Sequence, residues 1–358
     1  MRHLALGLLL ASVLSGCNLT ALTTSSEVIR TRIAGIRAEP AEISIGESTT
    51  LSALLVHTPS TKPNLGAIWF ACLEAGSARG CLGLDFETLG GGDDDDSASG
   101  TDFEAVQFGV GDEFVYTAEG PDLDTAWAAL DDDDRVEGLT VLVSVTYVER
   151  SDAELQAMLL ELALARQEGD QEVLEDLGAQ FQELLEEGIP AARRIVVSDK
   201  SLGNPEPTEC GADTLAPNAN PAVEGVTLHF DAEGRDGGFD LGPVTFVEPE
   251  SEIVLRPRVP PESAQEYLYI TTDLETECRQ ETPWYAWLTN SGSVARDYTF
   301  TADQGDLDEV PGRPKINRIA FPAREDFPDI LTLWLVVRDR RGGLDWIETR
   351  FAPLDPTE

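Results

Sequence analysis

Basic residues are scarce in this sequence relative to acidic ones. It carries 66 acidic residues against 25 basic ones, and the lysines are Lys62, Lys200 and Lys315. A formal net charge of -41 repels phosphate, which excludes nucleic acid as a partner and disfavours anionic lipid surfaces. An acidic, lysine-poor surface is typical of adaptation to a salty medium, where ions screen the repulsion. A site for a cation or a cationic partner is the functional alternative.

The motifs of common enzyme classes are missing too. The sequence has no Gly-x-Ser-x-Gly, no Cys-x-x-Cys and no glycine-rich loop followed by a phosphate-binding lysine. After residues 4–14, no apolar run approaches the length that spans a bilayer. Among 66 acidic residues, no carboxylate pair for glycoside hydrolysis can be singled out. We therefore expect no enzymatic activity, with a carbohydrate-active enzyme as a distant alternative.

The N-terminus carries an export signal. A short basic start precedes the apolar residues 4–14, which have the length of a signal-peptide core. Residues 14–17, Leu-Ser-Gly-Cys, resemble the lipobox of bacterial lipoproteins. This resemblance implies removal of residues 1–16 and a lipid on Cys17, which would anchor the protein to a membrane.

The residues after Cys17 bear on location. Asn18 stands where aspartate would favour retention in the inner membrane, so we expect the outer membrane. Residues 17–28 are mostly polar and lack a strong period, which predicts a flexible tether. The sequence thus predicts a lipid-anchored protein of the cell envelope.

Four cysteines remain besides the lipidated one: Cys72, Cys81, Cys210 and Cys278. An even number of cysteines in an exported protein favours disulfides. Three connectivities are open, and we prefer Cys72–Cys81 with Cys210–Cys278 because the first pair closes a short loop that contains glycine. Zinc is a weaker alternative, since the two histidines of the mature chain lie far from the cysteines in sequence.

Short segments rich in β-branched and aliphatic residues, separated by turn signals, predict a mainly β protein. We expect a β-sandwich over residues 29–200, a linker rich in Pro and Asn at 201–222, and a second sandwich over 223–354. The expected strands lie at residues 33–40, 49–56, 67–72, 103–108, 113–117, 139–148, 194–197, 225–230, 244–247, 253–259, 266–271, 284–288, 295–301, 318–321, 330–338 and 345–351.

A helical pattern interrupts the first sandwich. Residues 151–154, Ser-Asp-Ala-Glu, form a capping box, and apolar residues at helical spacing predict a helical hairpin over 152–188. We expect Gly188 to supply a left-handed cap. The apolar face either packs on the sandwich and on its own mate or binds a partner protein. The residues of the partner-binding hypothesis are Leu155, Leu159, Leu162, Leu177, Phe181 and Leu184.

Clustered carboxylates raise a calcium hypothesis, because hard cations prefer oxygen ligands. The strongest cluster alternates with glycines and consists of Asp231, Glu233, Asp236 and Asp240. Acidic runs at 93–96 and 131–134 are expected to lie in loops. None of these segments has EF-hand spacing, and solvated acidic loops are the simpler interpretation.

A faint internal repeat links the two halves. Trp69-Phe70-Ala71-Cys72 parallels Trp284-Tyr285-Ala286-Trp287, and we expect Trp69 and one of Trp284 and Trp287 to fill the cores.

The segments 38–42 and 69–72, the Asn-Pro linker and residues 337–346 resemble envelope lipoproteins of the myxobacterial type. Those proteins are similar to Ig-like or cadherin-like β-sandwich modules. The resemblance implies two Ig-like antiparallel sandwiches in tandem and transfers no catalytic residue. We expect a non-enzymatic envelope protein that makes protein or glycan contacts, with a calcium-dependent adhesion module as the alternative.

Overall fold

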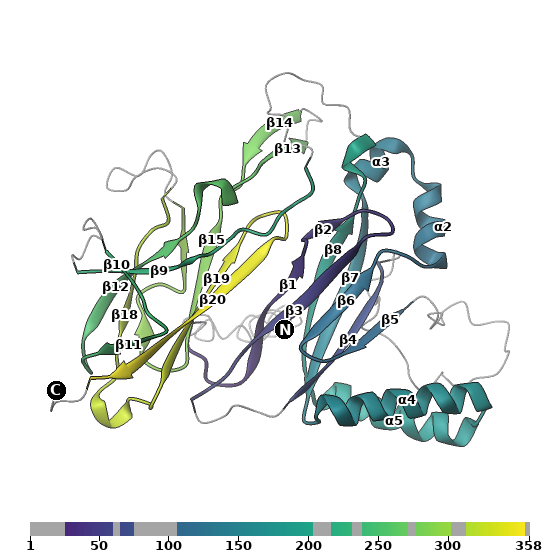
Figure 1. Cartoon of the computed structure of the whole chain (residues 1–358), viewed down its shortest axis with the longest axis horizontal. Helices are drawn as coiled ribbons and strands as arrows, with labels where there is room; N and C mark the ends of the chain where they lie inside the picture. Colours follow the sequence, from purple (N-terminus) through teal and green to yellow (C-terminus); the bar gives the residue numbers. More distant parts are fainter. Residues whose placement is uncertain are drawn as a thin grey trace, which may run out of the picture.

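The computed structural model describes residues 26–59, 65–74, 106–202, 216–230, 238–270, 276–301 and 313–354. These residues form a mainly β protein with several sheets, and the longer helices gather on one side (Figure 1). No helix in this part of the chain is long and apolar enough to cross a membrane.

Two sheets form the first half of the molecule. One has the strand order β1 (Arg32–Glu39), β3 (Ser48–Val56) and β6 (Glu113–Thr117). The other has the order β2 (Glu42–Ile43), β8 (Ile189–Val197), β7 (Leu139–Val148), β4 (Gly66–Leu73) and β5 (Gln107–Val110). Strand β2 runs parallel to β8, whereas the other pairs are antiparallel.

The core of this half lies between its two sheets. Alternate residues of β7 point into it, so Val141, Val143 and Val145 are fully buried. Trp69 of β4 lies among them, stacked on Phe114 with 6.0 Å between ring centroids. Its indole nitrogen donates to the Gly111 carbonyl at 2.8 Å, which satisfies the polar end of a buried side chain.

The second half also has two large sheets. One has the order β10 (Phe239–Asp240), β9 (Gly225–His229), β12 (Glu252–Arg258), β18 (Asn317–Ala320) and β16 (Ser293–Val294). The other has the order β11 (Val244–Val247), β20 (Leu344–Pro353), β19 (Leu331–Arg338), β15 (Trp284–Thr289) and β17 (Tyr298–Phe300). A separate two-stranded sheet pairs β13 (Glu266–Ile270) with β14 (Thr276–Gln280).

Trp287 is the largest side chain in the core of the second half. It is buried between the two large sheets, and its indole nitrogen donates to the Thr299 hydroxyl at 2.9 Å. Trp284, three residues earlier on β15, is half-buried and lies outside this core. The predicted core positions of Trp69 and of one of Trp284 and Trp287 are therefore confirmed.

The strand orders of the two halves match. In spatial order, β1-β3-β6 of the first half corresponds to β9-β12-β18 of the second. The order β2-β8-β7-β4-β5 of the first half likewise corresponds to β11-β20-β19-β15-β17 of the second. In each half a short early strand runs parallel to the last strand, as β2 does to β8 and β11 does to β20. The two tryptophan segments of the faint sequence repeat lie on the corresponding strands β4 and β15.

The first half also carries helices. Short α2 (Pro121–Ala129) and α3 (Asp132–Glu137) precede β7, whereas α4 (Asp152–Glu168) and α5 (Gln171–Glu187) lie between β7 and β8. The single-turn 3₁₀ helices are η6 (Lys200–Leu202), η8 (Pro261–Ser263) and η9 (Arg324–Asp326).

Side chains explain where these helices begin and end. The predicted capping box is present, since the Ser151 amide donates to the Glu154 carboxylate at 2.8 Å and the Glu154 amide donates back to the Ser151 hydroxyl. The expected left-handed cap at Gly188 is wrong. This residue has φ -73° because the chain enters β8 directly, and a side chain there would collide with Thr146. The acidic run 131–134 is also not a loop, because Asp131 caps α3 by accepting from the Asp134 amide.

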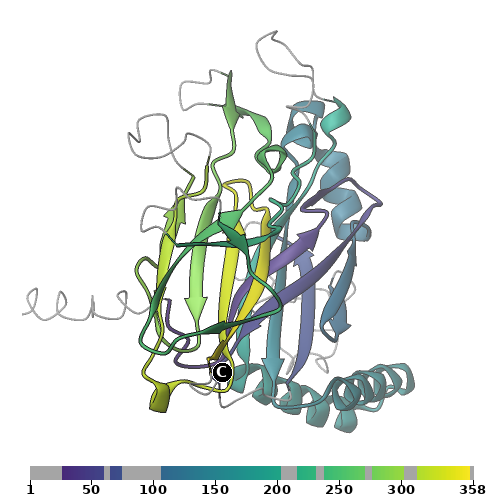
Figure 2. The ribbon, with the colours of Figure 1, turned by 60° about the vertical axis from the view of Figure 1, so that its left-hand side comes forward.

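Helices α4 and α5 pack against the five-stranded sheet of the first half, on the face that points away from β1 and β3 (Figures 1 and 2). Leu155 and Phe181 are fully buried there, against Ile68 and Phe70 of β4. Strand β4 is therefore covered on both faces and is buried along almost its whole length.

The two halves meet sheet against sheet. Leu54 and Val56 of β3 point away from their own core and pack against Trp334 and Val336 of β19, which point away from theirs. An ion pair between Arg37 and Asp345 at 2.7 Å adds a polar contact beside this apolar cluster. The described residues thus form one continuous stack of sheets, with a wide junction in its middle (Figure 1).

Candidate functional site

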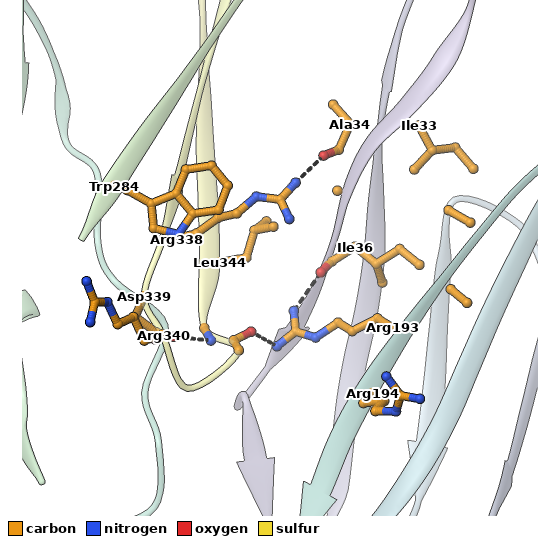
Figure 3. A pocket seen from close by; sticks show the side chains of 15 residues that line it. Ile33, Ala34, Ile36, Arg193, Arg194, Trp284, Arg338, Asp339, Arg340 and Leu344 are labelled. Atoms are coloured by element: carbon orange, nitrogen blue, oxygen red, sulfur yellow. Dashed lines mark hydrogen bonds between the residues drawn. The ribbon is translucent and has the colours of Figure 1, made fainter. Parts of the chain in front are cut away.

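A cleft of about 510 Å³ opens at the junction between the two halves. Its walls are the edge of β1, the middle of β8, Trp284 of β15 and the turn between β19 and β20 (Figure 3). These elements are far apart in sequence, so the site exists because the halves are joined.

The edge of β1 is closed by side chains rather than by another strand. Strand β1 pairs with β3 on one side, and an unpaired buried carbonyl on the other side needs a donor. Arg338 donates to the Ala34 carbonyl, Arg193 donates to the Ile36 carbonyl at 2.6 Å, and Asn220 donates to the Ala38 carbonyl at 2.6 Å. Arg338 belongs to the second half, so its bond to Ala34 also joins the halves, whereas Arg193 and Ile36 both belong to the first half.

The charges of Arg193 and Arg338 have no carboxylate partner within ion-pair distance in the described part of the chain. Their Nε atoms are buried without a hydrogen-bond partner among these residues. Burial lowers the pKa of Arg193 to about 10, although Asp339 opposes this, and burial also lowers the pKa of Arg338. A pKa of about 10 leaves Arg193 positive at neutral pH, and an arginine side chain such as that of Arg338 is not deprotonated in proteins.

Arg338 and Arg193 are fixed in place. The guanidinium of Arg338 lies over the Trp284 ring, 5.3 Å from its centroid, and Tyr298 packs on the same indole at 5.4 Å. Arg193 donates to the carbonyls of both Ile36 and Gly342. Their side chains are thus preorganised before anything enters the cleft.

Two further arginines line the cleft but direct their charges elsewhere. Arg194 forms a bidentate ion pair with Glu74, at 2.6 and 2.7 Å. Arg340 is exposed and extends away from Arg193 and Arg338 in Figure 3.

Asp339 organises the turn between β19 and β20. Its carboxylate accepts hydrogen bonds from the backbone amides of Arg341 and Gly343, both at 2.7 Å. Gly342 has φ 100°, and a side chain on Gly343 would collide with Asp339. The two glycines are therefore required for the turn itself.

Beside the cleft, the buried Glu42 joins the halves. It accepts from Ser198 Oγ and from the Asn218 amide, both at 2.6 Å, and pairs with Lys200 Nζ at 2.9 Å and Arg341 Nη2 at 3.6 Å. Burial alone would raise the pKa of Glu42, but the Ser198 hydroxyl, Lys200 and the Asn218 amide together lower it.

A second buried acid, Glu281, shares Arg341 with Glu42. Its carboxylate lies 3.3 Å from Arg341 Nη1 and accepts from the Gln265 amide at 3.1 Å. Burial and the negative charge of Asp339 raise the pKa of Glu281 to about 7, against the smaller lowering by Gln265 and Arg341. Near neutral pH this acid is therefore only partly ionised.

The chemistry of the cleft suits binding. Its lining combines fixed positive charge with apolar side chains from Ile33, Ile36 and Leu344, and includes no hydroxyl, thiol or imidazole side chain. Sequence reasoning missed the cleft. The arginines at 193 and 338 are far apart in the sequence, and no local pattern indicates that they meet.

The predicted sites have mixed outcomes. Cys17, Cys81 and Cys210 lie outside the described residues. Cys72 and Cys278 are both disulfide-bonded, and their pairing with the other two cysteines stays a prediction.

Of the expected calcium ligands, Asp231, Glu233 and Asp236 also lie outside the described residues, as does the run 93–96. The carboxylate of Asp240 forms an ion pair with the Arg258 guanidinium at 2.6 Å, so its charge is balanced by a side chain. Within the described ranges, no three His, Cys, Asp or Glu side chains are grouped to hold a metal ion.

The six residues of the partner-binding hypothesis are buried or partly buried. Leu155, Leu177 and Phe181 are buried, and the other members, Leu159, Leu162 and Leu184, are partly covered. The structure thus favours the alternative, in which this face packs within the molecule. Leu160 and Leu164 are the exposed leucines of α4.

Comparisons with known proteins give no family. No family model matches the chain, and no curated protein matches it. Three N-terminal domains of the highly immunogenic outer capsid protein of bacteriophage RB49 align over 90% of this chain and 59% of their own, at 7% identity and a TM-score of 0.18. The D00–D0 domain of intimin aligns over 91% of this chain and 99% of its own, at 7% identity and a TM-score of 0.21. Likenesses this weak carry no argument about the protein.

Proposed function

We propose that this chain is a non-enzymatic, lipid-anchored protein of the cell envelope that makes protein or glycan contacts through the junction cleft. In this proposal the halves are two Ig-like β-sandwiches in tandem, and the first carries a helical hairpin at residues 152–188. The matched strand orders of the halves support the tandem. The observation that carries the binding role is the cleft, whose fixed arginines and apolar lining come from both halves.

Binding at the cleft can be tested in the native envelope. A photo-crosslinking amino acid replaces Ala192, an exposed residue of the cleft wall, or Ala163, an exposed alanine on α4 that serves as the control. We expect an adduct of raised mass from position 192 and none from position 163. No adduct from position 192, or equal adducts from both, would show that the cleft is not the contact site.

The anchor has a separate test. Lipid on Cys17 predicts incorporation of a labelled fatty acid and recovery with outer membranes on a density gradient. The Cys17→Ser variant should lose both. If this variant fractionates with membranes as the unmodified protein does, the lipid is not the anchor.

A further inference from the structure

The search for a ligand starts from unbalanced charge. A partly buried cation is stable only when paired or well hydrogen-bonded, because removing charge from water is costly. Acids outnumber basic residues 66 to 25 in this chain, so a nearby carboxylate should be easy to supply. Yet Arg193 and Arg338 face one cleft without an ion-pair partner in the described part of the chain.

We infer that the cleft binds the oxyanion of a small organic acid, a carboxylate or a phosphate monoester, between Arg193 and Arg338. The inference rests on the proposed binding role of the cleft and names its ligand class. Planar guanidiniums match both oxyanions and form stronger hydrogen bonds with them than with neutral acceptors.

The geometry of the arginines supports this class. Each is held by a carbonyl of β1, Ile36 for Arg193 and Ala34 for Arg338, and Arg338 is also held against Trp284. Carbonyl contacts orient the guanidinium without neutralising its charge, and the Asp339 carboxylate, which attracts Arg193, lies beyond ion-pair distance. An arriving oxyanion would therefore meet positive charge that needs no rearrangement.

The rest of the cleft limits the ligand further. Its volume, about 510 Å³, lies in the range of sites for drug-sized molecules, and Ile33 and Leu344 supply apolar contacts. These features favour an organic acid over a bare inorganic ion. A polyanion would be repelled by the net charge of -41. Because Arg338 and Tyr298 pack on the Trp284 ring, this indole is a poor platform for stacking a neutral sugar.

The test uses the mature chain with Cys17→Ser, titrated calorimetrically with benzoate, phenyl phosphate and the neutral isostere benzamide. We expect saturable binding of benzoate, phenyl phosphate or both, weakening as salt is raised, and none of benzamide. Binding of one anion alone identifies its oxyanion as the preferred group. Failure of both anions to bind better than benzamide overturns the inference.

Variants locate the binding. Arg338→Gln should weaken it by about ten-fold or more, because a charged hydrogen bond is lost. Arg340→Gln and Arg194→Gln remove the same charge from lining residues that point elsewhere, and should leave the affinity within about two-fold. An equal loss in all three variants would overturn the site, and circular dichroism verifies folding of each. If Arg338→Gln does not fold, Arg338→Lys keeps the charge and should retain part of the affinity.

The outcomes separate the two proposals. An adduct from position 192 together with no oxyanion binding would refute the ligand class and leave the binding role standing. Absence of both the adduct and oxyanion binding would refute any binding role for the cleft.

Discussion

The two halves share a strand order but cover their most apolar strands differently. β4 of the first half and β19 of the second are each buried at seven successive positions. The outer face of β4 is covered by α4 and α5, whereas the outer face of β19 is covered by the first half. The same burial pattern thus arises from a pair of helices in one half and from the neighbouring half in the other. A strand without polar alternation shows that both faces are covered, but not by what.

The largest expected effect tests whether the two cores are equivalent. Trp69→Ala and Trp287→Ala each remove a fully buried indole and its hydrogen bond. Each should lower the free energy of unfolding by about 3–5 kcal/mol, measured by urea titration with far-ultraviolet circular dichroism. A loss below about 1 kcal/mol in one variant alone would mean that its core is much less well packed than the other.

The next largest effect is expected from a substitution that removes a polar contact between the halves. Glu42→Ala leaves Lys200 and Arg341 partly buried without this carboxylate and removes the acceptor for the Asn218 amide. We expect a loss of about 3 kcal/mol in the free energy of unfolding. Glu74→Ala, which breaks an exposed ion pair of the first half, is the control and should change little. Equal effects would show that Glu42 does not join the halves.

The two buried acids beside Arg341 should respond oppositely to pH. The raised pKa of Glu281 means that the folded state keeps a proton that the unfolded state has lost, so its stabilisation is present at low pH. This stabilisation is lost as pH rises from about 4.5 to about 7, by about 3 kcal/mol. The pKa of Glu42 is lowered in the folded state, so this acid stabilises the fold at pH values above the ordinary pKa of glutamate. That stabilisation is lost as the pH falls and Glu42 is protonated.

The Glu281→Gln variant tests whether Glu281 makes the folded state less stable as pH rises. The variant should show a flatter dependence of unfolding free energy between about pH 5 and 8 and should exceed the unmodified protein in stability at the upper end. An unchanged slope would show that Glu281 is ionised in the folded state at these pH values.

The smallest effect concerns the two sides of α4. Leu160, 62% exposed, faces away from the sheet that α4 covers, whereas Leu155 is fully buried. Leu160→Ala should change the free energy of unfolding by less than about 0.5 kcal/mol, whereas Leu155→Ala should cost about 2–5 kcal/mol. A large effect at Leu160 would mean that this side is also covered.

Local patterns predicted much of the secondary structure for a physical reason. Strands at 113–117, 139–148 and 244–247 have the expected bounds because β-branched and aromatic residues there fit a pleated, half-buried surface. The acidic run 131–134 was misread as a loop, although acids at a helix start interact favourably with the helix dipole. β2 and β10, of two residues each, are too short for any period to indicate.

The candidate site could not be predicted in this way. Its geometry depends on carbonyls at 34 and 36, an arginine at 193 and another at 338, which meet only when both halves are folded and joined. Part of the segment expected to be a linker belongs to the same junction, where Asn218 contacts Glu42 and Asn220 contacts Ala38. Composition indicated where the chain crosses between halves but not that the crossing is fixed.

The attachment of the N-terminal segment has a mechanical consequence. Residues 26–28, expected to be the end of a flexible tether, are bound to Thr289 of the second half through backbone hydrogen bonds. If lipid holds Cys17 as proposed, the chain from Cys17 to residue 25 can span at most about 32 Å. A force from the membrane would then act on the molecule at Val28, which packs between the two halves, rather than at one end. Both halves would reorient together, and their junction would stay close to the lipid surface.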